Sequence, residues 1–239
     1  MTTLPSGTAM AYTAAVNGHN VIMFMRDAKQ CQTINKDSRN PKYLSKYGLN
    51  PRGNAIRGIC TEDDLKNAFQ IENVVVILAL PCQLTPVWIK EHRDIIPEDV
   101  LLCSTSKGLY LPTQQLIGHA ILDALDRASQ PLCFLSGPSF AEEIVRGFPT
   151  AVVVASDKLY LAVLMQKLMS NKRSFRVYTS QDPIGMSFAA VREPTHSLKQ
   201  SSSATWWSSQ EPSCSWGRDD RRFGFRNQHS ICVCYSRLS

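Results

Sequence analysis

Several features that would direct a chain to a membrane, a metal or a nucleic acid are lacking from these 239 residues. No apolar run is long enough to cross a bilayer as a helix, and Met1–Ser6 has neither the basic start nor the apolar core of a signal sequence. The formal net charge of +6 is not gathered into a basic run. We therefore expect no membrane span and no nucleic-acid partner, while the mild basic excess suits anionic substrates.

The eight cysteines include no C-x-x-C pair. Cys82, Cys103 and Cys133 lie in or beside apolar runs, which is typical of small buried hydrophobic residues in a reducing compartment. The C-x-C at Cys232 and Cys234 has no second pair of ligands nearby in the sequence. We therefore expect no metal site.

Apolar strand candidates alternate with amphipathic helix candidates from Gly7 to about Thr179. The uninterrupted run VVVILAL at 74–80 is typical of a strand buried on both faces of a parallel sheet. The alternation predicts an α/β fold with a doubly wound, Rossmann-like sheet, whose ligands bind at the carboxyl ends of the strands. We expect strands at 20–25, 74–80, 100–104, 132–135, 151–155 and 175–178, and helices at 7–16, 85–92, 113–127, 139–146 and 159–169.

The composition changes after Phe188. Residues 194–215 are rich in Ser, Thr, Gln and Trp, with neither a helical nor a strand period, and a charge cluster follows at 218–222. Such a stretch has no plausible core face, and we expect a disordered tail.

Glycines and one lysine mark the candidate binding loops. A dinucleotide-binding turn needs G-x-G-x-x-G between a strand and a helix, and only its third glycine, Gly7, could be present here. Lys107 follows a buried strand, where an ammonium group can meet a phosphate or a developing alkoxide. By themselves, Gly7 also fits an ordinary loop glycine and Lys107 a solvated loop lysine.

The segment LSGPSFAEE at 135–143 has two interpretations. Ser139 and Glu142 are spaced as a capping box for the helix that follows, and this accounts for the pattern by local structure alone. The same arrangement places a helix start beside the end of a strand, where an anion can bind.

Taken in order, these segments resemble the N-terminal domain of NAD-dependent glycerol-3-phosphate dehydrogenase. The resemblance covers about 7–186, and the series from SGPSFA through PTA to FRVY is its most specific part. The quoted segments, in order, are SGTAMA, NGHNV, NPKYL, VVVILALPCQ, SKGL, LSGPSFAEE, FPTAVVVAS and FRVYTSQDPIGM.

The resemblance implies roles for particular residues. Lys107 would contact both NAD and substrate, Gly137 and Ser139 the glycerol phosphate, and Ala141, Pro81 and Gly7 the cofactor. The implied reaction passes hydride between NAD and glycerol 3-phosphate or dihydroxyacetone phosphate. An arginine after the second strand, Arg26, would also suit the 2′-phosphate of NADP. The family further suggests a homodimer and a cytoplasmic location, with organellar targeting left open.

Two regions depart from the family pattern. Met1–Ser6 stands where the first strand and first two glycines belong, so we expect a sheet that lacks its first strand. A one-base shift of reading frame from Trp206 onward, with permitted codons, yields GGALKNPLAVGAGMIEG and then GFGINT, which resembles the segment carrying the family's catalytic lysine. We infer that residues from Trp206 are translated out of frame, that Gln210 stands at the lysine codon, and that no catalytic residue is present.

The predicted organisation is an incomplete NAD-binding domain at 1–188 and an aberrant tail at 189–239 in place of a helical substrate domain. One hypothesis is therefore a member of an oxidoreductase family that does not itself catalyse the reaction. A second is a non-catalytic fragment that binds nucleotide weakly or dimerises. A third, a small nucleic-acid-binding protein, rests only on the basic composition.

Overall fold

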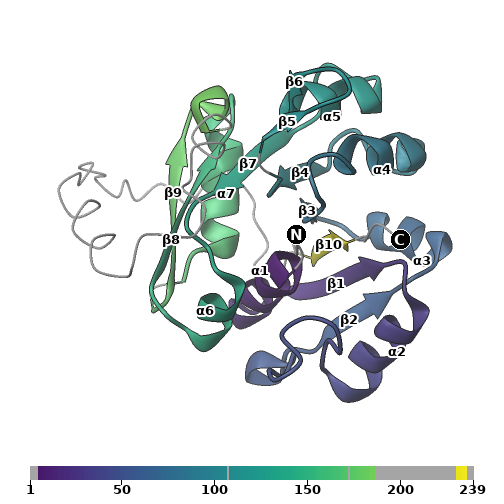
Figure 1. Cartoon of the computed structure of the whole chain (residues 1–239), viewed down its shortest axis with the longest axis vertical. Helices are drawn as coiled ribbons and strands as arrows, with labels where there is room; N and C mark the ends of the chain where they lie inside the picture. Colours follow the sequence, from purple (N-terminus) through teal and green to yellow (C-terminus); the bar gives the residue numbers. More distant parts are fainter. Residues whose placement is uncertain (1–4, 107, 172, 187–229, 236–239) are drawn as a thin grey trace.

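Eight strands lie side by side in one sheet with helices on both faces, in the computed structural model shown in Figure 1. The structure describes residues 5–106, 108–171 and 173–186, and the backbone of 230–235. Its strands are β1 (Asn20–Met25), β2 (Ile56–Ile59), β3 (Val74–Leu78), β4 (Leu101–Ser104), β5 (Leu109–Tyr110), β6 (Gln115–Leu116), β7 (Leu132–Ser136), β8 (Thr150–Ala155), β9 (Phe175–Ser180) and β10 (Ser230–Tyr235). Its helices are α1 (Pro5–Val16), α2 (Ala28–Asp37), the 3-10 turn η1 (Pro51–Gly53), α3 (Glu62–Phe69), α4 (Thr85–His92), α5 (Ile117–Leu125), α6 (Ala141–Arg146) and α7 (Leu159–Met169).

The strand order is β2-β1-β10-β3-β4-β7-β8-β9. All neighbours are parallel except β7 and β8, which run antiparallel. The doubly wound sheet predicted from the alternation is confirmed, with β5 and β6 forming a separate small hairpin.

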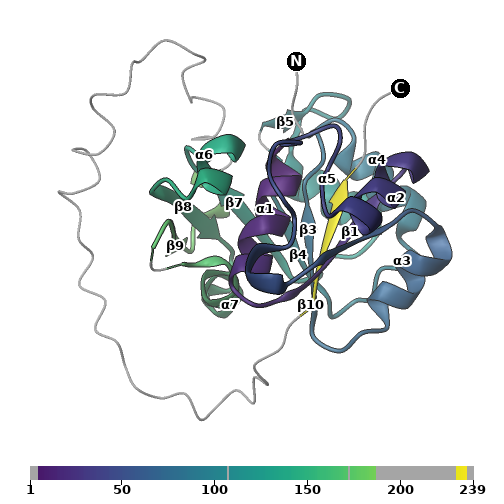
Figure 2. The same cartoon turned by 90° about the horizontal axis from the view of Figure 1, so that it is seen from below.

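The strand in the centre of the sheet comes from the far end of the sequence. β10 lies between β1 and β3, parallel to both, and Val233 is in register with Met23 on one side and Ile77 on the other (Figure 2). In the Rossmann order 3-2-1-4-5-6 this is the place of the first strand.

This finding corrects two expectations. The first-strand position is filled, and Ser230–Tyr235, which we assigned to a disordered tail, is a strand. Without it, β1 and β3 would face each other across a gap with unpaired backbone groups, and the β-branched and apolar sequence SICVCY suits that gap. The remaining tail residues, 189–229 and 236–239, lie outside the described residues.

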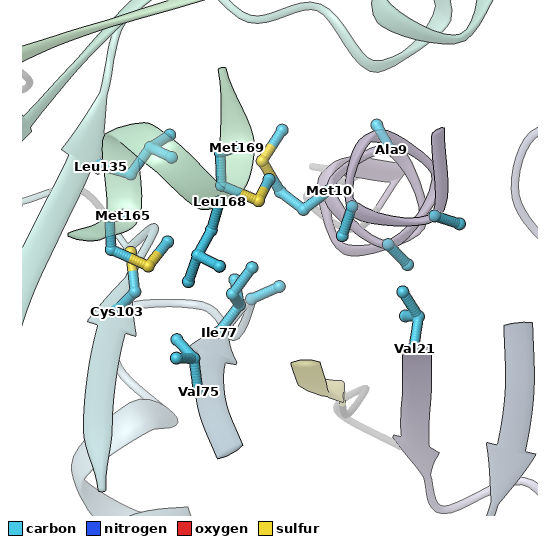
Figure 3. Packing of buried hydrophobic residues seen from close by; sticks show 14 of the residues in the cluster. Ala9, Met10, Val21, Val75, Ile77, Cys103, Leu135, Met165, Leu168 and Met169 are labelled. Carbon is cyan, nitrogen blue, oxygen red and sulfur yellow. The ribbon is translucent and has the colours of Figure 1, made fainter. Parts of the chain in front are cut away.

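The two faces of the sheet carry separate apolar cores because side chains alternate along each strand. In β3, Val75 and Ile77 pack beneath α1 and α7, while Val76 and Leu78 pack against α3, α4 and α5. Figure 3 shows the first core, where Met10 of α1 lies beside Met169 of α7, and Met165 of α7 lies beside Cys103 of β4. Each fully buried side chain of this size contributes about 1.5–3 kcal/mol.

Several element boundaries differ from the sequence prediction. The helix expected from Thr113 begins at Ile117, because Gln115 and Leu116 pair with Leu109 and Tyr110 in the hairpin. The elements α2, β2 and α3 were not predicted. Their starts carry recognisable caps: Asp27 accepts backbone N–H bonds at the start of α2, and Thr61 does the same at α3.

Candidate functional site

The carboxyl ends of the parallel strands β1, β10, β3, β4 and β7 meet at one edge of the sheet, which we call the ligand edge. Helix α1 is followed directly by β1 and packs against β1 and β10, so it runs back across the sheet and begins at this edge. The first turn of α1 contains no acidic side chain. The positive end of the helix dipole lies here, and no carboxylate of that turn opposes an anion.

Hydroxyl groups bind the loop after β3 to the loop after β4. The Ser106 hydroxyl donates to the carbonyl oxygen of Leu80 at 2.7 Å, and its oxygen lies 2.9 Å from the Thr85 hydroxyl. The backbone N–H and the hydroxyl of Thr105 both donate to the carbonyl oxygen of Leu78, at 3.1 and 3.2 Å. These bonds fix Pro81 and the residues just before Lys107 at the same edge.

The loop after β7 depends on a glycine. Gly137 has φ of +146°, and a Cβ there would lie 2.9 Å from both the carbonyl oxygen of Ala151 and the Cα of Val152. A side chain would therefore collide with the backbone of β8.

The predicted capping box at this loop is wrong. Helix α6 begins at Ala141 with Phe140 as its N-cap, and no side chain caps it. The Ser139 hydroxyl instead donates to the carbonyl oxygen of Gly137 at 3.3 Å. Glu142 accepts from Arg146 at 2.7 Å and from the hydroxyl of Tyr47 at 3.3 Å, and is drawn away from the helix start.

A buried polar chain supports the start of α1. Asn40 donates to the Thr8 hydroxyl at 2.9 Å and accepts from Gln30 at 2.8 Å. All three side chains are buried, so their hydrogen bonds hold the loop after α2 against the helix. No sequence pattern pointed to this role of Asn40, although Asn40 is the first residue of the NPKYL segment.

Exposed side chains of Arg146, Glu142 and Tyr47 form a small network of polar contacts beside α6. Arg146 donates to the Tyr47 hydroxyl at 2.9 Å and pairs with Glu142. The hydrogen bond that Arg146 donates to Tyr47 and the charge of Glu142 both raise the pKa of Arg146 above its already high ordinary value. The contact joins the loop after α2 to α6 on the surface.

Arg26 lies just past the end of β1, where a dinucleotide's ribose would be selected. Its guanidinium is 3.3 Å from the carboxylate of Glu91, and both side chains are about half exposed. The adjacent Asp27 is used as the cap of α2. The arginine that would attract a 2′-phosphate is therefore partly neutralised.

The structure brings most of the predicted residues to one region. Gly7 lies buried in the first turn of α1, Pro81 follows the end of β3, and Gly137 and Ser139 follow β7. Ala141 is buried in the core that includes Ala9 and Met10 of α1. Lys107 and Gln210 lie outside the described residues, and the roles of all these residues stay predictions.

The fold and the ligand edge define the class as a Rossmann-like α/β domain of the kind that binds dinucleotides. The family described as NAD-dependent glycerol-3-phosphate dehydrogenase N-terminus matches residues 6–162. The chain belongs to this family.

Curated relatives agree with this assignment. The chain is 36% identical over 184 residues to glycerol-3-phosphate dehydrogenase [NAD(P)+] of Halothermothrix orenii, covering 75% of this chain and 50% of the relative. It is 34% identical over 187 residues to glycerol-3-phosphate dehydrogenase [NAD(+)] 2, chloroplastic, of Arabidopsis thaliana, covering 77% of this chain and 43% of the relative. The chain thus spans about half the length of the curated relatives it matches.

Solved structures share the fold. The crystal structure of glycerol-3-phosphate dehydrogenase from Coxiella burnetii matches with a TM-score of 0.66 and 24% identity, over 77% of this chain and 53% of that one. The structure of DsGPDH of Dunaliella salina matches with a TM-score of 0.64 and 18% identity, over 77% of this chain and 33% of that one. Among the described residues, no helix is both long and apolar enough to cross a membrane.

Proposed function

We propose that this chain is the nucleotide-holding part of an NAD-dependent glycerol-3-phosphate dehydrogenase, an oxidoreductase that interconverts sn-glycerol 3-phosphate and dihydroxyacetone phosphate. The observation that carries the proposal is the convergence of family-matched loops at the ligand edge. The loops after β3 and β4 are bonded to each other there, beside the start of α1.

The residues at this edge suit NAD. The start of α1 would hold the pyrophosphate, with Gly7 allowing close approach and Pro81 and Ala141 contacting the dinucleotide. When bound, NAD supplies the hydride acceptor or donor. Lys107 would contact both cofactor and substrate, and Gly137 and Ser139 would hold the glycerol phosphate.

The same proposal separates binding from turnover. The family's general acid/base is a lysine, whereas Gln210 stands at the inferred lysine codon, and an amide does not titrate. The region 189–239 would replace the helical substrate domain. We therefore expect this chain to bind NADH and not to reduce dihydroxyacetone phosphate.

Two measurements test this. A fluorescence titration with NADH should saturate, Lys107→Ala should weaken it, and Lys66→Ala on the exposed side of α3 should not. Absorbance at the NADH band should stay constant when dihydroxyacetone phosphate is added. Absence of any NADH binding would overturn the binding proposal, and turnover abolished by Lys107→Ala would overturn the proposed inactivity.

A homodimer and a cytoplasmic location complete the proposal. Both are suggested by the family resemblance. Light scattering coupled to gel filtration measures the first, and imaging of the tagged native protein measures the second.

A further inference from the structure

The side chain of Asn40 joins segments that are far apart in the sequence. Its amide nitrogen donates to the hydroxyl of Thr8 in α1 at 2.9 Å, and its oxygen accepts from the side chain of Gln30 in α2 at 2.8 Å. The same oxygen also accepts the backbone N–H groups of Lys42 and Tyr43, at 3.1 and 3.3 Å. One side chain therefore orders its own turn and bonds that turn to two helices.

These two helices begin where the two parts of a dinucleotide would be held. Helix α1 begins at the ligand edge, where the pyrophosphate would lie, and Thr8 is in its first residues. Helix α2 begins just past the end of β1, beside Arg26, where the ribose of the adenosine half is selected. Gln30 is in the first turn of α2. The bonds from Thr8 through Asn40 to Gln30 therefore connect the pyrophosphate position with the ribose position.

The three side chains are too deeply buried to contact a ligand themselves. Thr8 and Asn40 are fully buried, and Gln30 is 3% exposed. Any effect that they have on binding must therefore pass through the backbone that they hold. Apolar contacts alone would tolerate small shifts between the two helices, whereas directional hydrogen bonds between buried groups specify one arrangement.

We propose that Asn40 is a positioning residue for the dinucleotide. Through Thr8 and Gln30 it sets the separation between the pyrophosphate position at α1 and the ribose position at α2. This inference rests on the proposed binding of NAD. A ligand that spans both positions depends on their separation, because a prearranged site spares it the cost of ordering the protein. A ligand that occupies only one position does not depend on it.

Thr8→Val is the first test, because valine has nearly the size of threonine and lacks the hydroxyl that Asn40 bonds. Fluorescence titration of the full chain should show NADH binding weakened by about threefold to tenfold, as expected when one hydrogen bond is lost. Asn40→Ala should weaken NADH binding at least as much. Thr8→Ser keeps the hydroxyl and should bind NADH more tightly than Thr8→Val.

Gln130→Leu is the matched control. Gln130 is also a buried amide, and it donates to the carbonyl oxygen of Val100 at 2.7 Å. Val100 directly precedes β4, so this bond lies at the edge of the sheet opposite the ligand edge. The variant should lose stability in chemical denaturation and keep the NADH affinity of the parent chain. An equal loss of NADH affinity in Gln130→Leu and Thr8→Val would point to general destabilisation and overturn the proposal.

Adenosine gives a readout that a general loosening of the fold would not spare. It carries no pyrophosphate, so its affinity, measured by displacement of NADH, should be the same in Thr8→Val and the parent chain. Equal weakening of adenosine and NADH would overturn the proposal, as would an unchanged NADH affinity in Thr8→Val. If Asn40→Ala fails to fold by circular dichroism, Thr8→Val decides.

Failure of the proposed function has a different signature. A parent chain that binds no NADH would overturn NAD binding itself and this inference with it. A parent chain that binds NADH, together with a Thr8→Val variant that binds it equally well, would overturn only the positioning role of Asn40.

Discussion

The Ser106 hydroxyl donates a 2.7 Å hydrogen bond to the carbonyl oxygen of Leu80, across the gap between two neighbouring strand ends. Ser106 directly precedes Lys107, and Leu80 directly precedes Pro81. One bond therefore sets the relative position of two loops that carry predicted cofactor contacts.

Ser106→Ala should lower the free energy of unfolding by about 1 kcal/mol, since a partly buried hydrogen bond is lost. It should also weaken NADH binding, because both loops gain freedom. Chemical denaturation and NADH titration measure the two effects. Thr113→Ala, which removes an exposed hydroxyl contact in the hairpin turn, serves as the control. Equal NADH affinities for Ser106→Ala and the parent chain would show that this bond does not position the site.

Gly137→Ala should destabilise the fold by about 2 kcal/mol or more, from a positive φ and a collision with β8. Gly147→Ala is a matched control, because its φ is +78° but a Cβ there would meet nothing within 4 Å. It should cost only about 1 kcal/mol, the conformational part of the penalty. Thermal denaturation of both variants separates the cost of the positive φ from the cost of the collision with β8. Similar losses of stability in the two variants would argue against the collision.

Ending the chain before Ser230 should remove the central strand of the sheet and expose the edges of β1 and β3. Native stability is only about 5–15 kcal/mol, so this loss should abolish cooperative unfolding. Ending the chain after Tyr235 keeps β10 and should leave the transition intact. A calorimetric scan of both truncated chains decides the point. An unchanged transition without β10 would show that the strand adds little.

Glu91→Gln should improve NADPH binding about threefold relative to NADH, because Arg26 is released for the 2′-phosphate and a repelling carboxylate is removed. Competition titrations with the two cofactors measure the ratio. Asp63→Asn, an exposed carboxylate of α3, should not change it. A ratio that stays constant in Glu91→Gln would mean that Arg26 does not approach the ribose.

Alkaline pH should weaken the fold through the buried thiol of Cys31 and the half-buried thiol of Cys82. Burial, with a smaller contribution from Cys60, raises the pKa of Cys31 from 9.0 to about 11, and burial raises that of Cys82 equally. The folded chain therefore binds more protons than the unfolded chain between these values. The stability gained from the protonated thiols is complete below pH 9 and is lost as the pH rises through about 11. Cys31→Ala should flatten the decline in unfolding free energy over this range, and an identical slope would exclude Cys31 as its source.

Long apolar runs made much of the fold predictable. The strand at 74–80 and the helices at 85–92 and 159–169 appear nearly as expected, because each forms from a local pattern and buries a continuous surface. The short elements α2, β2 and α3 were missed because four to ten residues of mixed polarity carry little periodicity. Their formation depends on caps such as Asp27 and Thr61, and on packing against the sheet.

The candidate site was predictable only in part. Segments such as LSGPSFAEE and SKGL pointed to Gly137, Ser139 and Lys107 through family resemblance. The supporting bonds from Asn40 to Thr8 and from Ser106 to Leu80 join residues far apart in the chain, and no spacing rule indicates such partners.

The sequence by itself determined the fold class, the parallel strands and the family, because these follow from local hydrophobic patterns and short motifs. Only the tertiary structure decided what fills the centre of the sheet. Six residues from the far end of the chain pair between β1 and β3, since backbone hydrogen bonding accepts any strand of suitable shape. Tertiary packing also decided which buried polar groups meet at the start of α1, where Gln30, Asn40 and Thr8 are linked by hydrogen bonds.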